Sequence, residues 1–247
     1  MTDLDGRLER EQQYHDHRYK NSSRDHQSEF YFILDHAFRQ SWDRISAYAR
    51  DAAVLEIGCG ARPMALQLAP IARQAAGIDI SSVAIEQATR QAEQSPVANL
   101  SLEVMNAEVL EFADASFDLV FGYGVIHHLD VARSFCEIAR VLRPGGHAVF
   151  WEPLGHNVLI NWYRRRTPGA RTVDEHPLKR HDLAVARALF SSVDVGFHGL
   201  SSLALIPFRG KPWAPSALPI FERLDRVALA LPGIRWLAWY STLVLSR

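Results

Sequence analysis

A short apolar segment followed by a glycine turn carries the clearest chemical signal in the chain. The segment Val54–Ile57 is typical of a buried strand, and Gly58 and Gly60 come directly after it. Glycine at these positions allows a sharp turn and lets backbone N–H groups approach a ligand closely, because no Cβ stands in the way. Pro63 then suits the first turn of a helix, where its missing N–H costs nothing. The pattern predicts a strand–turn–helix unit that cradles a ligand.

An acid at the end of the next predicted strand indicates the kind of ligand. Asp79 follows Gly60 at about the interval at which doubly wound sheets place the acid that accepts the ribose hydroxyls of a nucleotide. Dinucleotides and S-adenosylmethionine both use this arrangement. The dinucleotide fingerprint wants a third small residue where Pro63 stands, so the sequence disfavours a dinucleotide.

Strand and helix patterns alternate along most of the chain. From Glu29 to Ile45, apolar residues recur at the i, i+3, i+4, i+7 spacing of one helical face. Ser81 or Ser82 and Asp130 are suitable helix N-caps, and the segment 144–146 (Pro-Gly-Gly) should end a helix. This alternation predicts βαβ units and a mostly parallel sheet with helices on both faces. The expected strands are residues 54–57, 75–80, 100–105, 117–121, 147–152, 193–197 and 236–245, and the expected helices include 63–73, 178–190 and 220–231.

Five motifs in register resemble those of class I S-adenosylmethionine-dependent methyltransferases over roughly residues 50–152. The resemblance implies a doubly wound, Rossmann-like sheet of seven strands, mostly parallel, with an antiparallel C-terminal hairpin. The regular alternation of strands and helices lapses after Glu152, and a second irregular stretch follows at 206–215. We therefore expect a methyltransferase domain over 49–247 with irregular substrate-region insertions at about 153–177 and 200–215, and an N-terminal helical cover over 1–48. The motifs are Glu56-x-Gly58-x-Gly60, Asp79, Asn106-Ala107-Glu108, Phe117-Asp118-Leu119-Val120 and Leu142-Arg143-Pro144-Gly145-Gly146.

Position by position, the resemblance assigns nine residues to S-adenosylmethionine. The turn would cradle the cofactor, Asp79 would hold the ribose, Ile80 would pack on the adenine, and Tyr123 would lie near the methionine portion. Arg62 stands where the family often has a third glycine, so its contact with the cofactor is open. Asn106 replaces the usual Asp, although an amide oxygen can still accept a hydrogen bond from the adenine amino group. The nine residues are Glu56, Gly58, Cys59, Gly60, Asp79, Ile80, Asn106, Ala107 and Tyr123.

Methyl transfer requires the chain to exclude water, align the acceptor and, where the acceptor carries a proton, supply a base. Ligands of open α/β sheets bind at the carboxyl ends of the strands, which directs attention to the residues after the fourth and fifth strands. His156 is the first candidate base, and Glu152 and His127 are the other catalytic candidates. For His127 and its neighbour, a structural place in the wall of the site is the stronger expectation. The run 174–176 (Asp-Glu-His) adds three further acids and bases.

Composition bounds the remaining possibilities. The 247 residues carry a net charge of −1, so there is no global electrostatic case for a nucleic-acid partner. Two cysteines give no disulfide framework, and no metal is expected. The polar N-terminus, with no long apolar run anywhere, predicts a cytoplasmic protein without a transmembrane segment. Residues 1–25 are interpreted either as a frayed tail or as a lid over a bound ligand. The basic run 164–166 and nearby aromatic residues leave a peripheral membrane contact open.

The predicted function is methyl transfer to a small molecule, with S-adenosylhomocysteine as the second product. Oxygen is favoured over nitrogen or carbon as the accepting atom, in a natural-product, glycan or lipid-linked intermediate. Two other classes remain open: a non-catalytic, methyltransferase-like binding or regulatory subunit, and a nucleotide-dependent oxidoreductase. The acceptor, the general base and the oligomeric state are not specified by the sequence.

Overall fold

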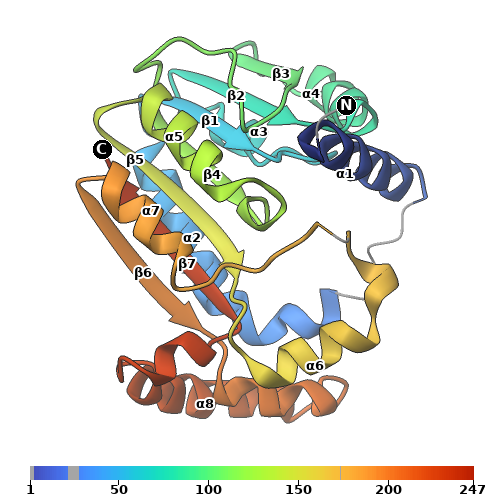
Figure 1. Ribbon diagram of the computed structural model, residues 1–247, viewed down its shortest axis with the longest axis vertical. Helices are drawn as coiled ribbons and strands as arrows, with labels where there is room; N and C mark the ends of the chain where they lie inside the picture. The colour runs from blue at the N-terminus through green and yellow to red at the C-terminus, as the bar shows by residue number, and fades with distance from the viewer. Residues whose placement is uncertain (1–2, 22–27, 173) are drawn as a thin grey trace.

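A single seven-stranded sheet organises the molecule in the computed structural model, which describes residues 3–21, 28–172 and 174–247 (Figure 1). The strand order is β3-β2-β1-β4-β5-β7-β6. Strand β7 is antiparallel to both of its neighbours, and all the other neighbouring pairs are parallel. The expected mostly parallel sheet with an antiparallel C-terminal hairpin is confirmed. The strands are β1 (Ala53–Ile57), β2 (Gln74–Asp79), β3 (Leu100–Val104), β4 (Phe117–Tyr123), β5 (Leu142–Pro153), β6 (Ser192–His198) and β7 (Tyr240–Ser246).

Helices cover both faces of this sheet and gather around the carboxyl ends of its parallel strands. The N-terminal helix α1 lies beside α4 in Figure 1, while α6 and α8 lie beyond the far end of β5. None of the helices among the described residues is both long enough and apolar enough to cross a bilayer. The α-helices are α1 (Asp3–Lys20), α2 (Asp35–Tyr48), α3 (Ala65–Leu68), α4 (Ser82–Glu93), α5 (Val131–Val141), α6 (Val158–Arg166), α7 (Asp182–Leu189) and α8 (Ala214–Ala228), and the 3₁₀ helices are η1 (Ser28–Leu34), η2 (Ile126–His128), η3 (Pro168–Ala170), η4 (Ser201–Phe208) and η5 (Ile234–Leu237).

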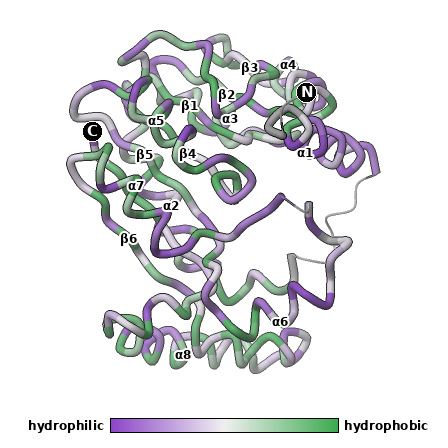
Figure 2. Tube along the Cα trace, viewed as in Figure 1, coloured by the Kyte–Doolittle hydropathy of each residue, from purple (hydrophilic) through white to green (hydrophobic). Residues whose placement is uncertain are grey.

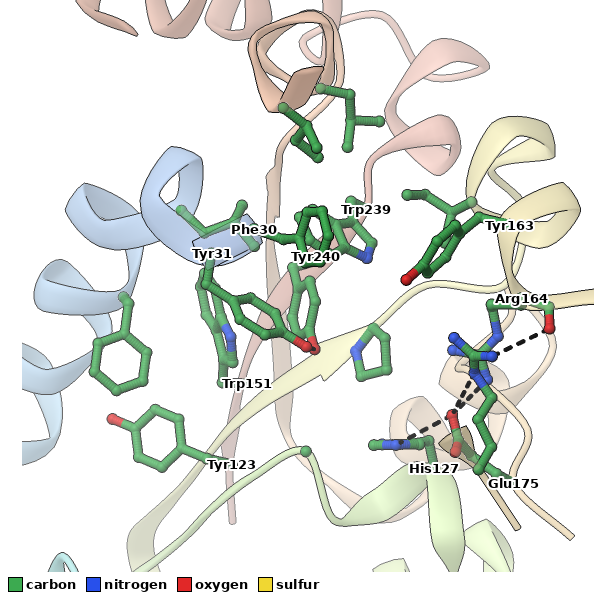
Figure 3. Close-up of a pocket in the computed structure, with 18 of the residues that line it drawn as sticks. Phe30, Tyr31, Tyr123, His127, Trp151, Tyr163, Arg164, Glu175, Trp239 and Tyr240 are labelled. Atoms are coloured by element: carbon green, nitrogen blue, oxygen red, sulfur yellow. Dashed lines mark hydrogen bonds and ion pairs between the residues drawn. The ribbon is translucent and has the colours of Figure 1, made fainter. Parts of the chain in front are cut away.

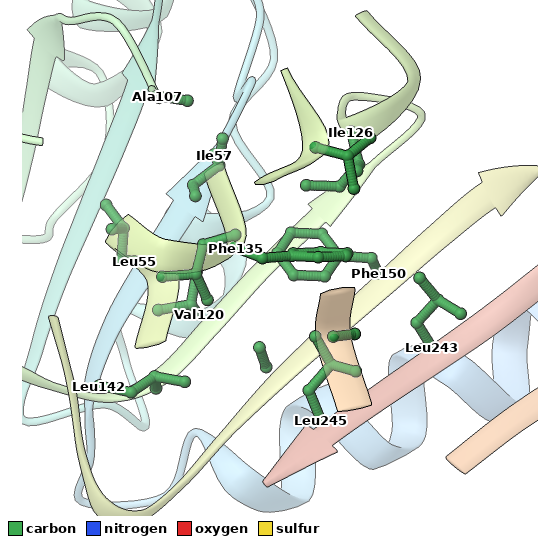
Figure 4. Close-up of a cluster of buried hydrophobic side chains, with 14 of the residues drawn as sticks. Leu55, Ile57, Ala107, Val120, Ile126, Phe135, Leu142, Phe150, Leu243 and Leu245 are labelled. Carbon is green, nitrogen blue, oxygen red and sulfur yellow. The ribbon is translucent and has the colours of Figure 1, made fainter. Parts of the chain in front are cut away.

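The core has two layers, because alternate side chains of each strand point to opposite faces of the sheet. Leu55 and Val120 pack on the face covered by α5 and α7, where Phe135 and Phe150 fill the centre (Figure 4). Val54 and its neighbours pack on the other face, under α2 and α3. Every residue of β1 is therefore buried, which explains why apolar and polar residues do not alternate along it and Glu56 is its one polar residue.

The helix termini follow the capping residues of the sequence in most places. Ser81 caps α4 by accepting a hydrogen bond from the Ala84 N–H, and Asp130 caps α5 in the same way from the Arg133 N–H. The Pro-Gly-Gly segment behaves differently from the expectation. Helix α5 already ends at Val141, and residues 142–146 run as the extended start of β5. A buried Leu142 pairs with Phe117 of β4, which extends the sheet past the glycines.

Several other predicted elements have different bounds in the structure. The helix expected over 63–73 is α3 at Ala65–Leu68, and the one expected over 220–231 is α8 at Ala214–Ala228. The strand expected over 236–245 begins only at Tyr240, because η5 occupies Ile234–Leu237. The single helix expected over 29–45 is a 3₁₀ segment followed by α2, because Leu34 is buried at their junction with backbone angles that break the α-helical run. The region 153–177, expected to be irregular, contains α6. Asn157 begins this helix by accepting a hydrogen bond from the Ile160 N–H. Both segments wall the larger of the two cavities described below.

Asp118 contacts three other segments near the amino ends of the central strands. Its ionisation should make the free energy of unfolding depend on pH. Its Oδ2 accepts hydrogen bonds from the Ala53 N–H (2.8 Å) and from the side chains of Arg73 and Arg143 (both 2.6 Å). Partial burial raises the pKa of Asp118, but these three donors outweigh it and hold the pKa below its usual value. A lowered pKa stabilises the folded state above the unfolded-state pKa of about 4, and that stabilisation is lost as the pH falls through the folded-state pKa.

We expect Asp118→Asn to lower the free energy of unfolding at pH 7 by about 1 kcal/mol, since the group is partly exposed and screened. The difference between the variant and the wild type should shrink as the pH falls below about 4, where the wild-type carboxylate becomes protonated too. Urea unfolding at pH 7, 5, 4 and 3 measures both quantities. A difference in the free energy of unfolding that stays constant over this range would show that the charge of Asp118 does not contribute to it.

Candidate functional site

Two neighbouring cavities lie beyond the carboxyl ends of the parallel strands. The smaller one, here called the cofactor cleft, has a volume of about 80 Å³ and follows the ends of β1, β2 and β4. The larger one, here called the acceptor cavity, has a volume of about 890 Å³ and lies against β5, β7, η1 and α6. They share four lining residues, so the two cavities meet there: His15, Tyr123, Gly124 and His128.

The glycine turn of the cofactor cleft is built as its sequence predicts. Gly58 has φ of +68° and Gly60 has φ of +59°, which are conformations that side chains rarely adopt. A Cβ at Gly58 would lie 2.6 Å from the Val125 side chain, and a Cβ at Gly60 would lie 2.5 Å from the Tyr19 hydroxyl. Only glycine fits either place. The backbone of the glycine turn therefore lies directly against Val125 and Tyr19, with no room for a side chain between them.

Asp79 lies at the end of β2 with its carboxylate held in place by the turn. Its Oδ2 accepts a hydrogen bond from the Gly60 N–H and its Oδ1 accepts one from the Ser81 N–H, both at 2.9 Å. A carboxylate on the wall of a cleft can accept hydrogen bonds from the hydroxyls of a ribose. The residue is nearly buried and also lines the cleft. Its geometry therefore fits the ribose of a nucleoside ligand.

Helix α1 covers the cofactor cleft from the outside. It is mostly hydrophilic along its length (Figure 2), yet Arg7, Glu11, His15 and Tyr19 recur every four residues and so share one face. The Arg7 side chain pairs with Glu108 and also donates a hydrogen bond to the His128 carbonyl. Glu11, His15 and Tyr19 line the cleft itself.

A cavity that encloses a small-molecule ligand commonly has a volume of 300 Å³ or more. The cleft beneath α1 is several times smaller, and side chains of α1 form part of its lining. Of the two interpretations of the N-terminal residues, the structure places 3–20 in a helix that covers a site. Residues 22–25 lie outside the described part of the chain.

Aromatic side chains form most of the acceptor cavity (Figure 3). Trp151 of β5 stacks on Tyr240 of β7 with ring centroids 5.3 Å apart, and Trp239 stacks on Tyr31 at the same separation. The Tyr31 and Tyr240 hydroxyls are 3.4 Å apart. Charges occupy one end of the cavity, where Arg164 pairs with Glu175. The aromatic lining residues are Phe30, Tyr31, Phe38, Tyr123, Trp151, Trp162, Tyr163, Trp239 and Tyr240.

His127 and Glu152 form a buried pair at the wall of the acceptor cavity. Glu152 is fully buried at the end of β5, and its Oε1 accepts hydrogen bonds from the Val125 and Ile126 N–H groups, both at 2.9 Å. Its Oε2 lies 2.7 Å from His127 Nδ1. The other ring nitrogen, Nε2, lies 3.8 Å from Glu175, which is beyond hydrogen-bonding range. Figure 3 shows the His127 ring between the cavity and Glu175.

Six of the nine residues assigned to the cofactor by resemblance line the cleft, and three do not. Those that line it are Gly58, Asp79, Ile80, Asn106, Ala107 and Tyr123. Glu56 lies behind the turn, where its Oε2 accepts a hydrogen bond from the Ala65 N–H at 2.7 Å. Burial raises the pKa of Glu56 to about 8. Cys59 is buried beside Gly77, and Gly60 contributes its N–H to Asp79.

Not all of the remaining candidate residues line one of the two cavities. His156, the first candidate base, is absent from the lining of both cavities: its Nε2 accepts a hydrogen bond from the Arg180 N–H, and its ring packs edge-on against Trp236. Arg62 is exposed and does not line the cleft either. Of the acidic run after residue 173, Glu175 does line the acceptor cavity.

Sequence reasoning missed the contribution of α1. The four-residue recurrence of Arg7, Glu11, His15 and Tyr19 was a usable signal, because such spacing places side chains on one helical face. The role of His128, which lines both cavities, had no signal of its own beyond its position after β4.

Comparison with known proteins agrees with this geometry. A family model described as a methyltransferase domain matches residues 55–150. An uncharacterized methyltransferase of Bacillus subtilis, YcgJ, is 36% identical over 167 residues, which are 65% of this chain and 63% of that protein. The ubiquinone/menaquinone biosynthesis C-methyltransferase UbiE of Geotalea uraniireducens is 30% identical over 129 residues, which are 49% of this chain and 55% of that protein.

Solved structures show the same fold. The YcgJ crystal structure superposes with a TM-score of 0.59 at 19% identity, covering 85% of this chain and 97% of that one. The phosphoethanolamine N-methyltransferase 2 of Haemonchus contortus, in complex with phosphomonomethylethanolamine and S-adenosylhomocysteine, has a TM-score of 0.62 at 19% identity, covering 85% of this chain and 52% of that one.

The chain spans only 55–63% of the length of these two curated relatives. The matched residues 55–150 contain the glycine turn, the acid after β2 and all of strands β2, β3 and β4. By this match and its motifs, residues 55–150 form a methyltransferase domain of the class I S-adenosylmethionine-dependent type, and the whole sheet has the fold of the solved structures.

Proposed function

We propose that this chain transfers a methyl group from S-adenosylmethionine to a hydroxyl oxygen of a flat, largely apolar acceptor. The observation that carries the proposal is the meeting of the two cavities at His15, Tyr123, Gly124 and His128, with the His127–Glu152 pair on the acceptor side. One cavity has the features of a nucleoside site and the other has the size of a small-molecule site. A methyl group on a cofactor bound in the cofactor cleft would therefore reach the acceptor cavity where the two cavities meet.

The residues of the cofactor cleft fit S-adenosylmethionine. Asp79 presents a positioned carboxylate for the ribose hydroxyls, and Ile80, Asn106 and Ala107 offer apolar groups and an amide to an adenine ring. S-adenosylmethionine supplies a methyl group on a sulfonium, so the leaving group comes with the cofactor. The chain's own task is to bind, to exclude water and to prepare the acceptor.

His127 is the proposed general base. Because the Glu152 carboxylate already accepts two backbone hydrogen bonds, its remaining oxygen accepts the proton of His127 Nδ1. That contact fixes the tautomer and leaves the lone pair on Nε2, as carboxylate–histidine pairs do in other enzymes. Nε2 is then placed to accept a proton from a hydroxyl in the acceptor cavity, while Glu152 acts as the positioning residue. His156, outside the cavity, has no such access.

The lining of the acceptor cavity supports an aromatic acceptor. Aromatic side chains bind flat rings through offset or edge-to-face contacts, and nine of them line this cavity. Its main charges are matched internally, since Glu175 pairs with Arg164 and lies 3.9 Å from Arg171. A strongly charged acceptor would have to displace these pairs. The cavity therefore favours a phenol-like molecule over a charged amine or a sugar phosphate.

The proposal is tested with S-adenosylmethionine and a panel of phenols, hydroquinones, aliphatic alcohols and amines. Formation of S-adenosylhomocysteine reports turnover, and mass spectrometry with NMR locates the new methyl group. We expect turnover with aromatic hydroxyl compounds and methylation on oxygen. Methylation on carbon, the atom that the name of the UbiE relative gives for that protein, would overturn the oxygen assignment. Binding of the cofactor without turnover of any acceptor would favour a non-catalytic subunit.

His127→Ala should lower kcat by about 10² to 10⁴-fold on the best acceptor, because a positioned general base contributes roughly this much. The affinity for S-adenosylhomocysteine should remain within about three-fold of the wild type, since His127 does not line the cofactor cleft. His156→Ala is the matched comparison, and we expect it to retain the wild-type kcat. Steady-state kinetics and calorimetry measure these quantities. Loss of activity in the second variant rather than the first would transfer the role of base to His156.

A further inference from the structure

A buried carboxylate on α1 faces two histidine nitrogens at the junction of the two cavities. Glu11 is only 4% exposed, although it belongs to a hydrophilic surface helix. Its Oε2 lies 3.2 Å from His128 Nδ1 and 3.5 Å from His15 Nε2. These three ligand atoms come from two elements that are far apart in sequence, α1 and η2, and all lie within 4.8 Å of one another.

Hydrogen bonds do not account for this cluster. Neither oxygen of Glu11, nor Nδ1 of His128, has a hydrogen-bond partner among the residues that the structure describes. The groups beside the Glu11 carboxylate are the two histidine nitrogens and the Thr172 hydroxyl. A buried charge is costly unless it is paired or coordinates a metal.

An arginine on the same helix is engaged elsewhere. Arg7, one turn earlier on the same helical face, is paired with Glu108. The groups that face the Glu11 carboxylate are two imidazoles, and the neutral imidazole is the commonest metal ligand in proteins.

We propose that Glu11, His15 and His128 bind a divalent transition-metal ion, with Zn²⁺ the best match. Zn²⁺ bound to histidine nitrogen and carboxylate oxygen at about 2.0–2.2 Å in tetrahedral geometry separates its ligand atoms by roughly 3.3–3.5 Å. The two measured separations from Glu11 agree with this edge length. Two histidines and one carboxylate leave a fourth position for water or a ligand group.

A second group of possible ligands lies close by but is less suitable. His127, His128 and Glu175 also bring their ligand atoms within 4.8 Å of one another. In that group, however, Glu175 is already paired with Arg164, and His127 Nδ1 is held by Glu152. The metal would have to compete with these contacts. The carboxylate of Glu11 has no comparable partner among the described residues.

The site would join α1 to the loop after β4. Two ligands come from the helix and one from the strand end, so the ion would hold α1 over the cofactor cleft. This differs from the expectation, on sequence, that no metal is bound. The proposal stands independently of the proposed function, because it concerns only these three side chains and their charge.

The test strips the purified chain with a chelator and then titrates it with Zn²⁺ and with Co²⁺. Competition with a chromophoric chelator gives the affinity for Zn²⁺, elemental analysis gives the stoichiometry, and the visible absorption of Co²⁺ reports its coordination geometry. We expect one ion per chain and the intense absorption of tetrahedral Co²⁺. Glu11→Gln and His15→Ala should each raise the Kd for Zn²⁺ by at least about 100-fold. This is more than the usual effect of losing a residue that only hydrogen-bonds to a metal ligand.

His17→Ala is the matched control, because it removes a histidine from the exposed side of the same helix. It should leave the Kd for Zn²⁺ unchanged, and circular dichroism should show the wild-type fold for all three variants. Fewer than about 0.1 ions bound per wild-type chain would overturn the proposal. So would equal affinity in the wild type, Glu11→Gln and His15→Ala, or a loss of affinity in His17→Ala as large as in the other two.

Discussion

Asp79→Ala should raise the Kd for S-adenosylhomocysteine by at least about 100-fold. The Asp79 carboxylate lines the cofactor cleft, and hydrogen bonds from two ribose hydroxyls to a charged group are worth about 1.5–3 kcal/mol each. Two of them amount to about 3 kcal/mol or more, which corresponds to two or more powers of ten in affinity. The substitution also removes the acceptor of the Gly60 N–H, so the turn itself loses a support.

Isothermal calorimetry on the wild type and the variant measures this difference. Asp194→Ala is the control, because its side chain is 73% exposed on β6, far along the sheet from the cleft, and reaches Arg44 only at 3.8 Å. It should leave the Kd unchanged. If the wild type binds while Asp79→Ala binds within three-fold of it, the ribose assignment is wrong. If the wild type binds neither S-adenosylmethionine nor its product, the proposed function itself fails.

Glu152→Ala should lower the free energy of unfolding by about 3–5 kcal/mol, the usual cost of removing one member of a buried, hydrogen-bonded charge network. The variant leaves the Val125 and Ile126 N–H groups and His127 Nδ1 without their acceptor. Because Glu152 is fully buried, water cannot replace it without opening the end of β5. Urea denaturation measures the loss, with the m-value as a check on two-state behaviour.

Two further variants serve as comparisons for Glu152→Ala. Glu152→Gln keeps one carbonyl oxygen of the same shape, so it should lose only about 1–2 kcal/mol. Glu86→Ala removes an acid that is 65% exposed and pairs with Arg90 on the surface of α4, and should change stability by less than about 0.5 kcal/mol. A loss below about 1 kcal/mol in Glu152→Ala would mean that the loop after β4 is held by other contacts.

The succession of strands and helices along the chain was predictable from the sequence because its signals are local. The buried run of β1, the N-caps Ser81 and Asp130, and the glycines at 58 and 60 each depend on a few neighbouring residues. Local patterns of this kind determine strands, helix starts and turn conformations. The position of Asp79 after β2 follows in the same way, since the carboxyl ends of parallel strands share one edge.

Element bounds were less predictable where tertiary packing competes with local preference. The Pro-Gly-Gly segment was expected to end a helix, but the pairing of Leu142 with Phe117 extends β5 through it. Helix α6, expected to be irregular chain, forms where it walls the acceptor cavity.

The sequence by itself determined the fold, the family and most of the cofactor cleft, because a strand order and a glycine turn follow from short-range patterns. Only the tertiary structure decided which histidines lie at the two proposed sites. It joined His127 to Glu152, left His156 outside the cavity, and brought Glu11 and His15 of α1 to His128. These pairings join residues far apart in the chain, and no local pattern encodes a contact that depends on how a helix docks against a strand end.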